Sequence, residues 1–300
     1  MMISDSELNK RIDTAHHLLK QCWVCPRSCG INRLKNDKSG FCRSGLYPTI
    51  SSVNAHHGEE PPISGTRGSG TIFFTNCNLR CMYCQNYPIS QMGNGVEKTP
   101  DELSDQMLWL QKKGCHNVNF VTPTHYMPQI LKSLGIARQR GFNLPIVYNT
   151  SGYESLETLR MLEGIIDIYL PDMRYSDDRV GQKYSAAPNY SEVNRAAVKE
   201  MYRQVGNLVA DEQGIAQRGL IIRHLVLPNR LAGTEEIMKF LAHEISKEVY
   251  ISLMAQYFPA YKAHTTVELS RKITGEEYEE AYQIKQKYGL ENGWVQEHAL

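Results

Sequence analysis

The chain has 300 residues and a formal net charge of +1, and its Lys and Arg residues are spread along it without a basic block. This pattern argues against a nucleic-acid partner, because phosphates demand a concentrated positive face. The length can bury a substantial core in one large domain or two, and no apolar run approaches the roughly 20 residues that span a bilayer, so we expect no membrane span.

Residues 1–21 lack the apolar core of a signal peptide and have the periodicity of an amphipathic helix, so we expect a cytoplasmic protein. Four cysteines follow this helix: Cys22, Cys25, Cys29 and Cys42. Two thiols spaced CxxC, with two more on a following loop, are typical of a closed four-thiolate metal site. The spacing fits zinc and a second iron–sulfur cluster equally well. A disulfide framework is disfavoured, because disulfides belong to oxidising compartments.

The composition changes near residue 65 and divides the chain into two parts. We expect residues 1–65 to form a helix and a cysteine-rich metal-binding segment with few strands, and residues 66–300 to form the second part. The first part ends in the run HHGEEPPISG. In this run, His57, Glu59 and Glu60 either touch substrate or belong to a rigid, proline-anchored turn between the two parts, and the sequence does not decide between these roles.

In the second part, short apolar runs alternate with stretches of helical periodicity. The apolar runs are residues 71–75, 118–121, 146–148, 165–170, 220–227 and 249–254. The helical stretches are residues 99–113, 126–140, 154–163, 190–205, 234–245 and 275–288. This alternation predicts an α/β fold with a parallel sheet and right-handed crossovers. About six such units predict an open, partial (β/α)6 barrel instead of a closed eightfold one.

The loop after the first apolar run carries Cys77, Cys81 and Cys84, spaced CxxxCxxC. Iron–sulfur cubes are held by Cys thiolates, one per iron, so three thiolates leave one iron without a protein ligand. An open position of this kind is where a small molecule coordinates, as at a catalytic zinc. Zinc would need a fourth ligand nearby, and a disulfide between two of these cysteines would leave the third thiol unpaired. The loop therefore predicts a 4Fe–4S cluster with one open iron, and leaves Cys115 as a buried structural thiol.

Polar residues follow the predicted strands, at the end of a parallel barrel where chemistry takes place. The candidates for a binding site are Tyr83 on the cysteine loop and, after the later strands, Asn149, Ser151, Asp172, Arg174, Arg223 and Gln256. Each has a simpler explanation. Ser151 can cap a helix, and Asp172 with Arg174 can be a structural ion pair. Because the strand ends meet on one rim above an open iron, the set together predicts a binding site.

Four segments carry a resemblance to a known family: CNLRCMYCQN (77–86), NTSGY (149–153), DMR (172–174) and IRHLVLP (222–228). With them the chain resembles the radical S-adenosylmethionine family of pyruvate formate-lyase activating enzyme homologues. The runs CPRSCGINR and HGEEPPISG resemble the branch with a cysteine-rich N-terminal segment. Three departures put a glycyl-radical substrate in doubt: TPTH (122–125) replaces a GGEP run, Arg174 replaces a lysine, and Asn149 replaces an aspartate.

The resemblance implies that a 4Fe–4S cluster reductively cleaves S-adenosylmethionine to methionine and a 5′-deoxyadenosyl radical, with an electron from a flavodoxin or ferredoxin. That radical abstracts hydrogen from an inert carbon. The resemblance also implies that Tyr83 lies near the adenine, and that residues 149–151 meet the ribose or the methionine carboxylate. Arg174 or Arg223 would bind that carboxylate through a planar two-donor fork. Asp172 and Gln256 complete the expected cofactor site.

Three functions remain open. The first is a radical oxidoreductase that acts on a protein, a peptide or a small molecule. The second is an activating enzyme for a glycyl-radical enzyme, which needs room for a protein loop. The third is a zinc-type binding module without catalysis, and it does not account for the three-cysteine loop. The sequence does not identify the hydrogen donor.

Overall fold

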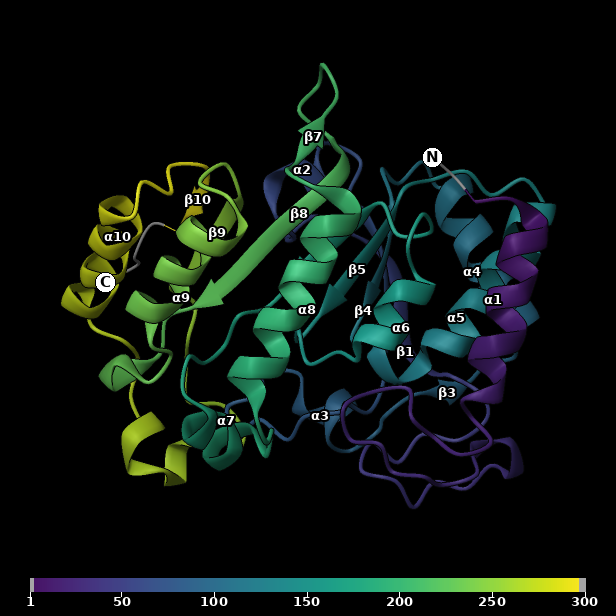
Figure 1. The fold of residues 1–300 in the computed structure, drawn as a ribbon, viewed down its shortest axis with the longest axis horizontal. Coiled ribbons are helices and arrows are strands. Elements are labelled where there is room, and N and C mark those ends of the chain that lie inside the picture. The colour runs from purple at the N-terminus through teal and green to yellow at the C-terminus, as the bar shows by residue number, and fades with distance from the viewer. Residues whose placement is uncertain (1–2, 297–300) are drawn as a thin grey trace.

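The computed structural model describes residues 3–296. Its centre is one sheet in the order β10-β9-β8-β6-β5-β4-β2-β1-β3, with β7 paired to β8 beside this path (Figure 1). The strands are β1 Thr49–His56, β2 Ser69–Phe74, β3 Val96–Glu97, β4 Val118–Val121, β5 Ile146–Thr150, β6 Ile168–Pro171, β7 Val209–Ala210, β8 Ala216–Leu225, β9 Tyr250–Met254 and β10 Gly293–Val295.

The pairing confirms the predicted fold class. From β2 through β4, β5, β6, β8 and β9 to β10, every neighbouring pair is parallel, and the sheet curves without closing. The six predicted strands are the first six of this series. The strands are buried on both sides because helices cover the sheet, which is why they appear in the sequence as continuous apolar runs.

One strand, β1, lies in the described part of the chain before residue 65, where the sequence predicts few strands. β1 pairs antiparallel with β2, from Ile50 opposite Phe74 to His56 opposite Ser69, and β3 pairs with the far side of β1. The predicted boundary at residue 65 therefore falls between two paired strands. Only Ile50 of β1 is buried, so this strand has no apolar face for a sequence pattern to show. β1 is a strand because its backbone pairs with that of β2.

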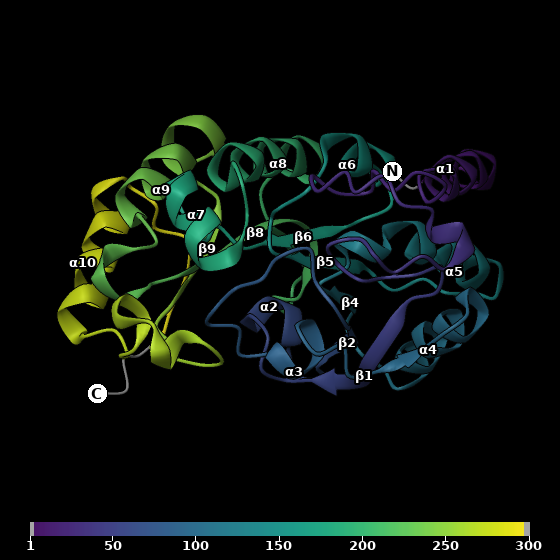
Figure 2. The same cartoon turned by 90° about the horizontal axis from the view of Figure 1, so that it is seen from below.

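The α-helices are α1 Asp5–His17, α2 Pro61–Ser64, α3 Tyr87–Ser90, α4 Pro100–Lys112, α5 Met127–Gln139, α6 Leu156–Met161, α7 Asp178–Ser185, α8 Tyr190–Val205, α9 Thr234–Phe240 and α10 Gly275–Lys287. Figure 2 shows α6, α8 and α9 along one side of the curved sheet, with α2 and α3 on the opposite side. No helix within residues 3–296 is long and apolar enough to cross a membrane.

The cysteine-rich segment packs against the barrel as irregular loops. In Figure 1 these loops (purple) lie at the same end of the molecule as α3, which follows the CxxxCxxC loop. Several hydrogen bonds hold the segment against the barrel; for example, Thr158 donates to the Val24 carbonyl at 2.8 Å, and Arg33 donates to the His125 carbonyl at 2.7 Å. The segment is therefore placed beside the carboxyl ends of the strands.

Candidate active site

A cavity of about 360 Å³ opens where the parallel strands end. Six strands and the segments that follow them contribute to it. Its polar lining consists of Cys77, Cys81, Cys84, Asn86, Ser90 and Gln91 after β2, Thr122 after β4, Asn149, Thr150 and Ser151 at the end of β5, Asp172 and Arg174 after β6, and Arg223 of β8, together with His56 at the end of β1 and Glu59 after it. The three-cysteine loop and most of the candidate residues predicted from the sequence therefore share one cavity.

The sulfur atoms at the cysteine end of the cavity receive several hydrogen bonds. The backbone N–H of Leu79 donates to Cys77 Sγ at 3.3 Å, and Ser185 Oγ donates to Cys81 Sγ at 3.0 Å. Arg174 Nη1 lies 3.7 Å from Cys81 Sγ. Burial raises the pKa of the Cys77 thiol, and the neighbouring thiol of Cys81 raises it further. A thiolate here therefore needs the compensation that a metal centre and these donors provide.

The groups around the three cysteines fit an iron–sulfur cluster. Nowhere in residues 3–296 do three Cys, His, Asp or Glu side chains gather closely enough to hold one metal ion. A cube does not require such close sulfur atoms, because each thiolate binds its own iron. Three thiols on one cavity wall, with donors aimed at their sulfurs and a guanidinium beside them, are the groups that an anionic iron–sulfur cluster needs.

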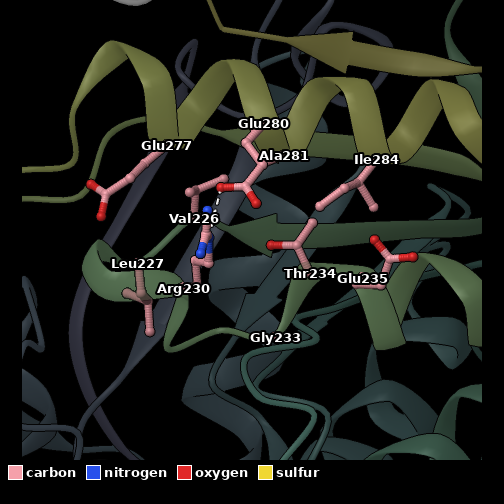
Figure 3. A pocket seen from close by; sticks show the side chains of 10 residues that line it. All are labelled: Val226, Leu227, Arg230, Gly233, Thr234, Glu235, Glu277, Glu280, Ala281 and Ile284. Atoms are coloured by element: carbon pink, nitrogen blue, oxygen red, sulfur yellow. Dashed lines mark hydrogen bonds and ion pairs between the residues drawn. The ribbon is translucent and has the colours of Figure 1, made fainter.

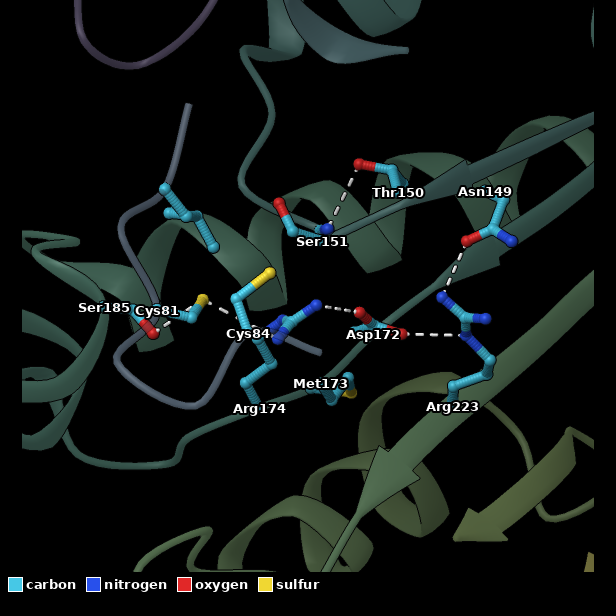
Figure 4. A network of polar contacts seen from close by, with 12 residues as sticks. Cys81, Cys84, Asn149, Thr150, Ser151, Asp172, Met173, Arg174, Ser185 and Arg223 are labelled. Atoms are coloured by element: carbon cyan, nitrogen blue, oxygen red, sulfur yellow. Dashed lines mark hydrogen bonds and ion pairs between the residues drawn. The ribbon is translucent and has the colours of Figure 1, made fainter. Parts of the chain in front are cut away.

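A charged network crosses the cavity beside the cysteines (Figure 4). Asp172 lies between two guanidinium groups, 2.5 Å from Arg174 Nη2 and 2.8 Å from Arg223 Nε. Arg223 Nη2 also donates to Asn149 Oδ1 at 2.6 Å. The side chains of Asp172, Arg174 and Arg223 are only 9%, 24% and 19% exposed. Two buried cations therefore share one carboxylate, and the network retains capacity for a further anion.

Two buried polar atoms of this cavity have no hydrogen-bond partner within the described chain. They are Arg174 Nε and Ser151 Oγ. Buried polar groups in folded proteins are nearly always paired, so these two atoms indicate a polar ligand that lies in the cavity. The arrangement can bind an anionic group through guanidinium and hydroxyl donors next to a metal cluster.

Two further predicted residues lie apart from this group. Tyr83 lines an adjoining cavity of about 140 Å³, which Asp172, Arg174 and Arg223 also border, and its hydroxyl is 2.6 Å from that of Tyr175. The exposed side chain of Gln256 lines neither cavity. It contacts Met254 and Gln296 instead. Its carbonyl accepts a hydrogen bond from Gln85 at 3.0 Å, and both Gln85 and Met254 line the adjoining cavity. Gln256 therefore lies beside that cavity without lining it.

Two carboxyl groups at the strand ends were not assigned from the sequence. Burial raises the pKa of Glu59 to about 7, and Asn149 Nδ2 donates to its Oε2 at 3.3 Å. Burial also raises the pKa of Glu154 to about 7. Glu154 accepts hydrogen bonds from Thr124, at 2.5 Å, and from Thr150. Glu59 faces the cavity, whereas Glu154 lies beneath its floor and holds Thr150.

The segment TPTH, which replaces the family's glycine-rich run, contributes Thr122 to the cavity and Thr124 and His125 to the core. Thr122 lines the cavity with a backbone φ of +61°, a conformation that is unusual for a β-branched residue. Thr124 and His125 are buried beneath it. His125 Nε2 is bonded to the Thr75 carbonyl at 2.9 Å, and burial lowers its pKa to about 3. His125 is therefore a neutral structural histidine.

The N-terminal cysteines lie in their own cluster. All eight cysteines of the chain are free thiols. Cys22, Cys25 and Cys42 are buried, and Cys29 is partly exposed. Burial raises the pKa of Cys25, and the neighbouring thiols of Cys42, Cys22 and Cys29 each raise it further. The four thiols are neighbours, although no three of them surround a single-ion position.

Comparison with known proteins gives one family model and two relatives. Residues 71–203 match the model of the radical SAM superfamily. From Methanocaldococcus jannaschii, the uncharacterized protein MJ0674 is 32% identical over 296 residues, covering 95% of this chain and 80% of that protein. The uncharacterized protein MJ0808 of the same organism is 25% identical over 285 residues, covering 86% of this chain and 78% of that protein.

Among solved structures, the fold is similar to that of HydG, a maturase of the FeFe hydrogenase. The TM-score is 0.52 at 10% sequence identity, over 97% of this chain and 63% of that one. At this identity the likeness concerns the fold alone. It agrees with the open, mostly parallel barrel described above.

Proposed function

We propose that this chain, which belongs to the radical SAM superfamily, is an oxidoreductase that cleaves S-adenosylmethionine reductively and removes hydrogen from a protein, peptide or small-molecule substrate. One observation supports this most strongly. The three thiols of the CxxxCxxC loop and the Asp172–Arg174–Arg223 network line the same cavity, at the end of the barrel where parallel-barrel enzymes perform chemistry.

The chain's own residues would hold and orient the reactants. Cys77, Cys81 and Cys84 would ligate a 4Fe–4S cluster, and the donors to their sulfur atoms would offset its negative charge. Arg174 or Arg223 would bind the methionine carboxylate through a planar fork of two donors. When bound, the cluster and S-adenosylmethionine supply the radical chemistry, while the barrel orients the substrate and excludes water.

The N-terminal cysteines belong to the same proposal as a second metal centre, with zinc or a second iron–sulfur cluster. A flavodoxin or ferredoxin in the cytoplasm would supply the electron. The role of an activating enzyme for a glycyl-radical enzyme is the second candidate. It rests on the resemblance of the cluster loop, CNLRCMYCQN, to that branch of the superfamily.

Formation of 5′-deoxyadenosine tests the proposal. The anaerobically reconstituted protein should form it from S-adenosylmethionine and dithionite, and Cys81→Ala should abolish it, because one iron loses its protein ligand. Cys115→Ala is the matched control, since Cys115 is equally buried but lies outside the cavity. The control should retain activity. A Cys81→Ala protein that still forms 5′-deoxyadenosine contradicts the assignment.

A further inference from the structure

We propose that Glu59, Glu60 and Asn119 form the part of the cavity that recognises the substrate, and that they bind a primary ammonium group on an aliphatic chain. This inference rests on the proposed function, because it treats the occupant of the cavity beside the cluster as the substrate. It deepens that proposal by naming the chemical class of the substrate, an aliphatic amine that is either free or the side chain of a lysine.

The first support is the position of Glu59 at the end of the cavity away from the cysteines. At one end of the Asp172–Arg174–Arg223 network, a guanidinium nitrogen lies 3.7 Å from Cys81 Sγ (Figure 4). At the other end, Arg223 donates to Asn149 Oδ1 at 2.6 Å, and Asn149 Nδ2 donates to Glu59 at 3.3 Å. A ligand that contacts Glu59 and extends along the network therefore reaches towards the cluster loop.

The second support is the rigid backbone of the run that carries the two acids. The Glu60 carbonyl accepts from the N–H groups of Ile63 and Ser64 at 2.9 and 3.0 Å, and the Glu59 carbonyl accepts from the Ser64 hydroxyl at 3.1 Å. Asn117 donates to the Ile63 carbonyl at 2.8 Å, and the Ile63 side chain is fully buried in a cluster with residues of β5, β6 and β8. The rigid turn and the contact with substrate, which the sequence left as alternatives, are therefore compatible.

The third support is a pair of buried polar side chains without partners. Glu60 is 8% exposed and its Oε2 has no hydrogen-bond partner within residues 3–296. Asn119 is 0% exposed, and neither its Oδ1 nor its Nδ2 has a partner in the same residues. On β4, Asn119 lies on the same face as Val121, which lines the cavity. Because buried polar groups are nearly always paired, these atoms indicate a polar ligand.

The charges of this region call for a cation. No ion pair within residues 3–296 includes Glu59 or Glu60. The nearest guanidinium, that of Arg223, is paired with Asp172 at 2.8 Å. If Arg174 takes the methionine carboxylate, both glutamates lack a cation, and unpaired carboxylates are costly in a buried site. A cationic ligand would supply the missing charge.

The acceptors and the cavity wall match an aliphatic ammonium group. Such a group has three donors and no acceptor, and Glu59, Glu60 and Asn119 Oδ1 offer three acceptors. Phe73 and Val121 line the same cavity and provide an apolar wall for the carbon chain. The cavity volume of about 360 Å³ is of the size that small-molecule sites have in proteins.

The protonation of Glu59 should respond to such a ligand. Burial raises the pKa of Glu59 to about 7, Arg223 lowers it, and the carboxylates of Glu60 and Asp172 raise it further. His56 also lines the cavity. An ammonium group beside Glu59 favours its charged form, so binding should release a proton and should tighten as the pH rises from about 6 to about 8.

Equilibrium binding of ammonium probes to the whole, cluster-loaded chain with S-adenosylmethionine tests the inference. The probes are n-butylammonium and Nα-acetyl-lysine N-methylamide, and 1-butanol is the neutral control, all followed by ligand-observed NMR. Wild-type protein should bind n-butylammonium about tenfold more tightly than 1-butanol, because hydrogen bonds to a charged group are the stronger ones. Tighter binding of the lysine amide would identify a peptide as the source of the amine, and tighter binding of n-butylammonium a free amine; both outcomes support the site.

Glu59→Gln and Glu60→Gln should each weaken binding of n-butylammonium about tenfold and leave binding of 1-butanol unchanged. Glu59→Gln should also remove the tightening with pH, although His56 remains. Glu212→Gln is the matched control, since Glu212 is an exposed acid in the turn between β7 and β8, at the end of the molecule opposite α3 (Figure 1). The iron content of each variant shows whether it is folded and loaded, and misfolding of one leaves the other informative.

Equal affinities of wild-type protein for n-butylammonium and 1-butanol would overturn the inference, and this comparison requires no variant. An equal loss of binding in Glu212→Gln would overturn it as well. Failure of the proposed function is distinct, because the wild-type protein would then form no 5′-deoxyadenosine from S-adenosylmethionine and dithionite, whether or not the probes bind.

Discussion

At the residue scale, Glu154 links the stability of the barrel to the candidate site. It is 2% exposed, accepts hydrogen bonds from Thr124 and Thr150, and is within 3.4 Å of the Tyr148 hydroxyl. Thr150 Oγ1 in turn accepts a hydrogen bond from the Gly152 N–H at 3.2 Å. Glu154 therefore fixes the end of β5, from which Asn149 and Ser151 reach the cavity, and acts as a positioning residue.

As the pH rises, the stability of the wild-type protein should fall relative to the stability of Glu154→Gln. Burial raises the pKa of Glu154 to about 7 from 4.5, so the folded state favours the protonated acid. This contribution is fully present below the unfolded pKa and is lost as the pH rises through the folded value. The difference between the two proteins should change by about 3 kcal/mol between pH 4 and pH 8, measured by denaturant unfolding.

Glu59 also titrates in this range, but it is present in both proteins and cancels in their difference. Parallel stability curves for the wild-type protein and Glu154→Gln would show that the pKa of Glu154 is the same in the folded and unfolded states, and would contradict this prediction. The sequence did not reveal this role, because an acid at the start of the predicted helix 154–163 is ordinary near a helix N-terminus. Its hydrogen bonds to Thr124 and Thr150 exist only after β4 and β5 have paired.

At the scale of elements, α10 is attached to the barrel by its first turn. Thr274 and Glu277 form a capping box, and the Glu277 carboxylate also accepts from the Asn229 N–H at 2.7 Å and from Arg271. These bonds border a cavity of about 130 Å³ between α10 and the start of α9, where Arg230 pairs with Glu280 (Figure 3). Glu277 and the Arg230–Glu280 pair therefore join α10 to the loop after β8.

Glu277→Ala should lower the free energy of unfolding by about 2 kcal/mol, because the cap, the Asn229 N–H and Arg271 all lose their acceptor. The bond from Arg271 lowers the pKa of Glu277 to about 2, so this contribution is present above pH 4.5 and is lost as the pH falls towards 2. Glu276→Ala is the matched control, since Glu276 is an exposed acid in the same turn. Equal effects of the two substitutions, in thermal or denaturant unfolding, would contradict this account of the cap.

Helices and strands with an apolar pattern of their own could be predicted from the sequence. Helices and strands that depend on pairing or packing with neighbouring segments could not. The helix predicted over residues 190–205 matches α8, and the run 118–121 matches β4. β1 was missed because most of its side chains are exposed. α7 was missed because its eight residues are largely polar, with Gly181 and Tyr184 buried against the structure around them.

At the scale of the whole molecule, parallel topology explains why the candidate site could be assembled from sequence. The residues that follow parallel strands converge on one rim, so Asn149, Asp172 and Arg223 were expected together, and the structure places them around one cavity. Gln256, which follows β9, has an exposed side chain and lies beside the adjoining cavity. Contacts between the N-terminal cysteine loops and the CxxxCxxC loop, such as the hydrogen bond from Arg27 to the Asn78 carbonyl at 2.9 Å, could not be predicted, because they depend on the packing of loops that have no periodic signal.

The proposed function requires that one iron of the cluster at Cys77, Cys81 and Cys84 is open and that S-adenosylmethionine binds to it. Hyperfine spectroscopy of the reduced, reconstituted protein with isotopically labelled S-adenosylmethionine measures this directly. We expect a coupling between the cluster spin and the labelled amino nitrogen of the methionine moiety, which Cys81→Ala should lose together with the cluster. A fully loaded wild-type cluster without such a coupling would show that S-adenosylmethionine does not bind to the open iron.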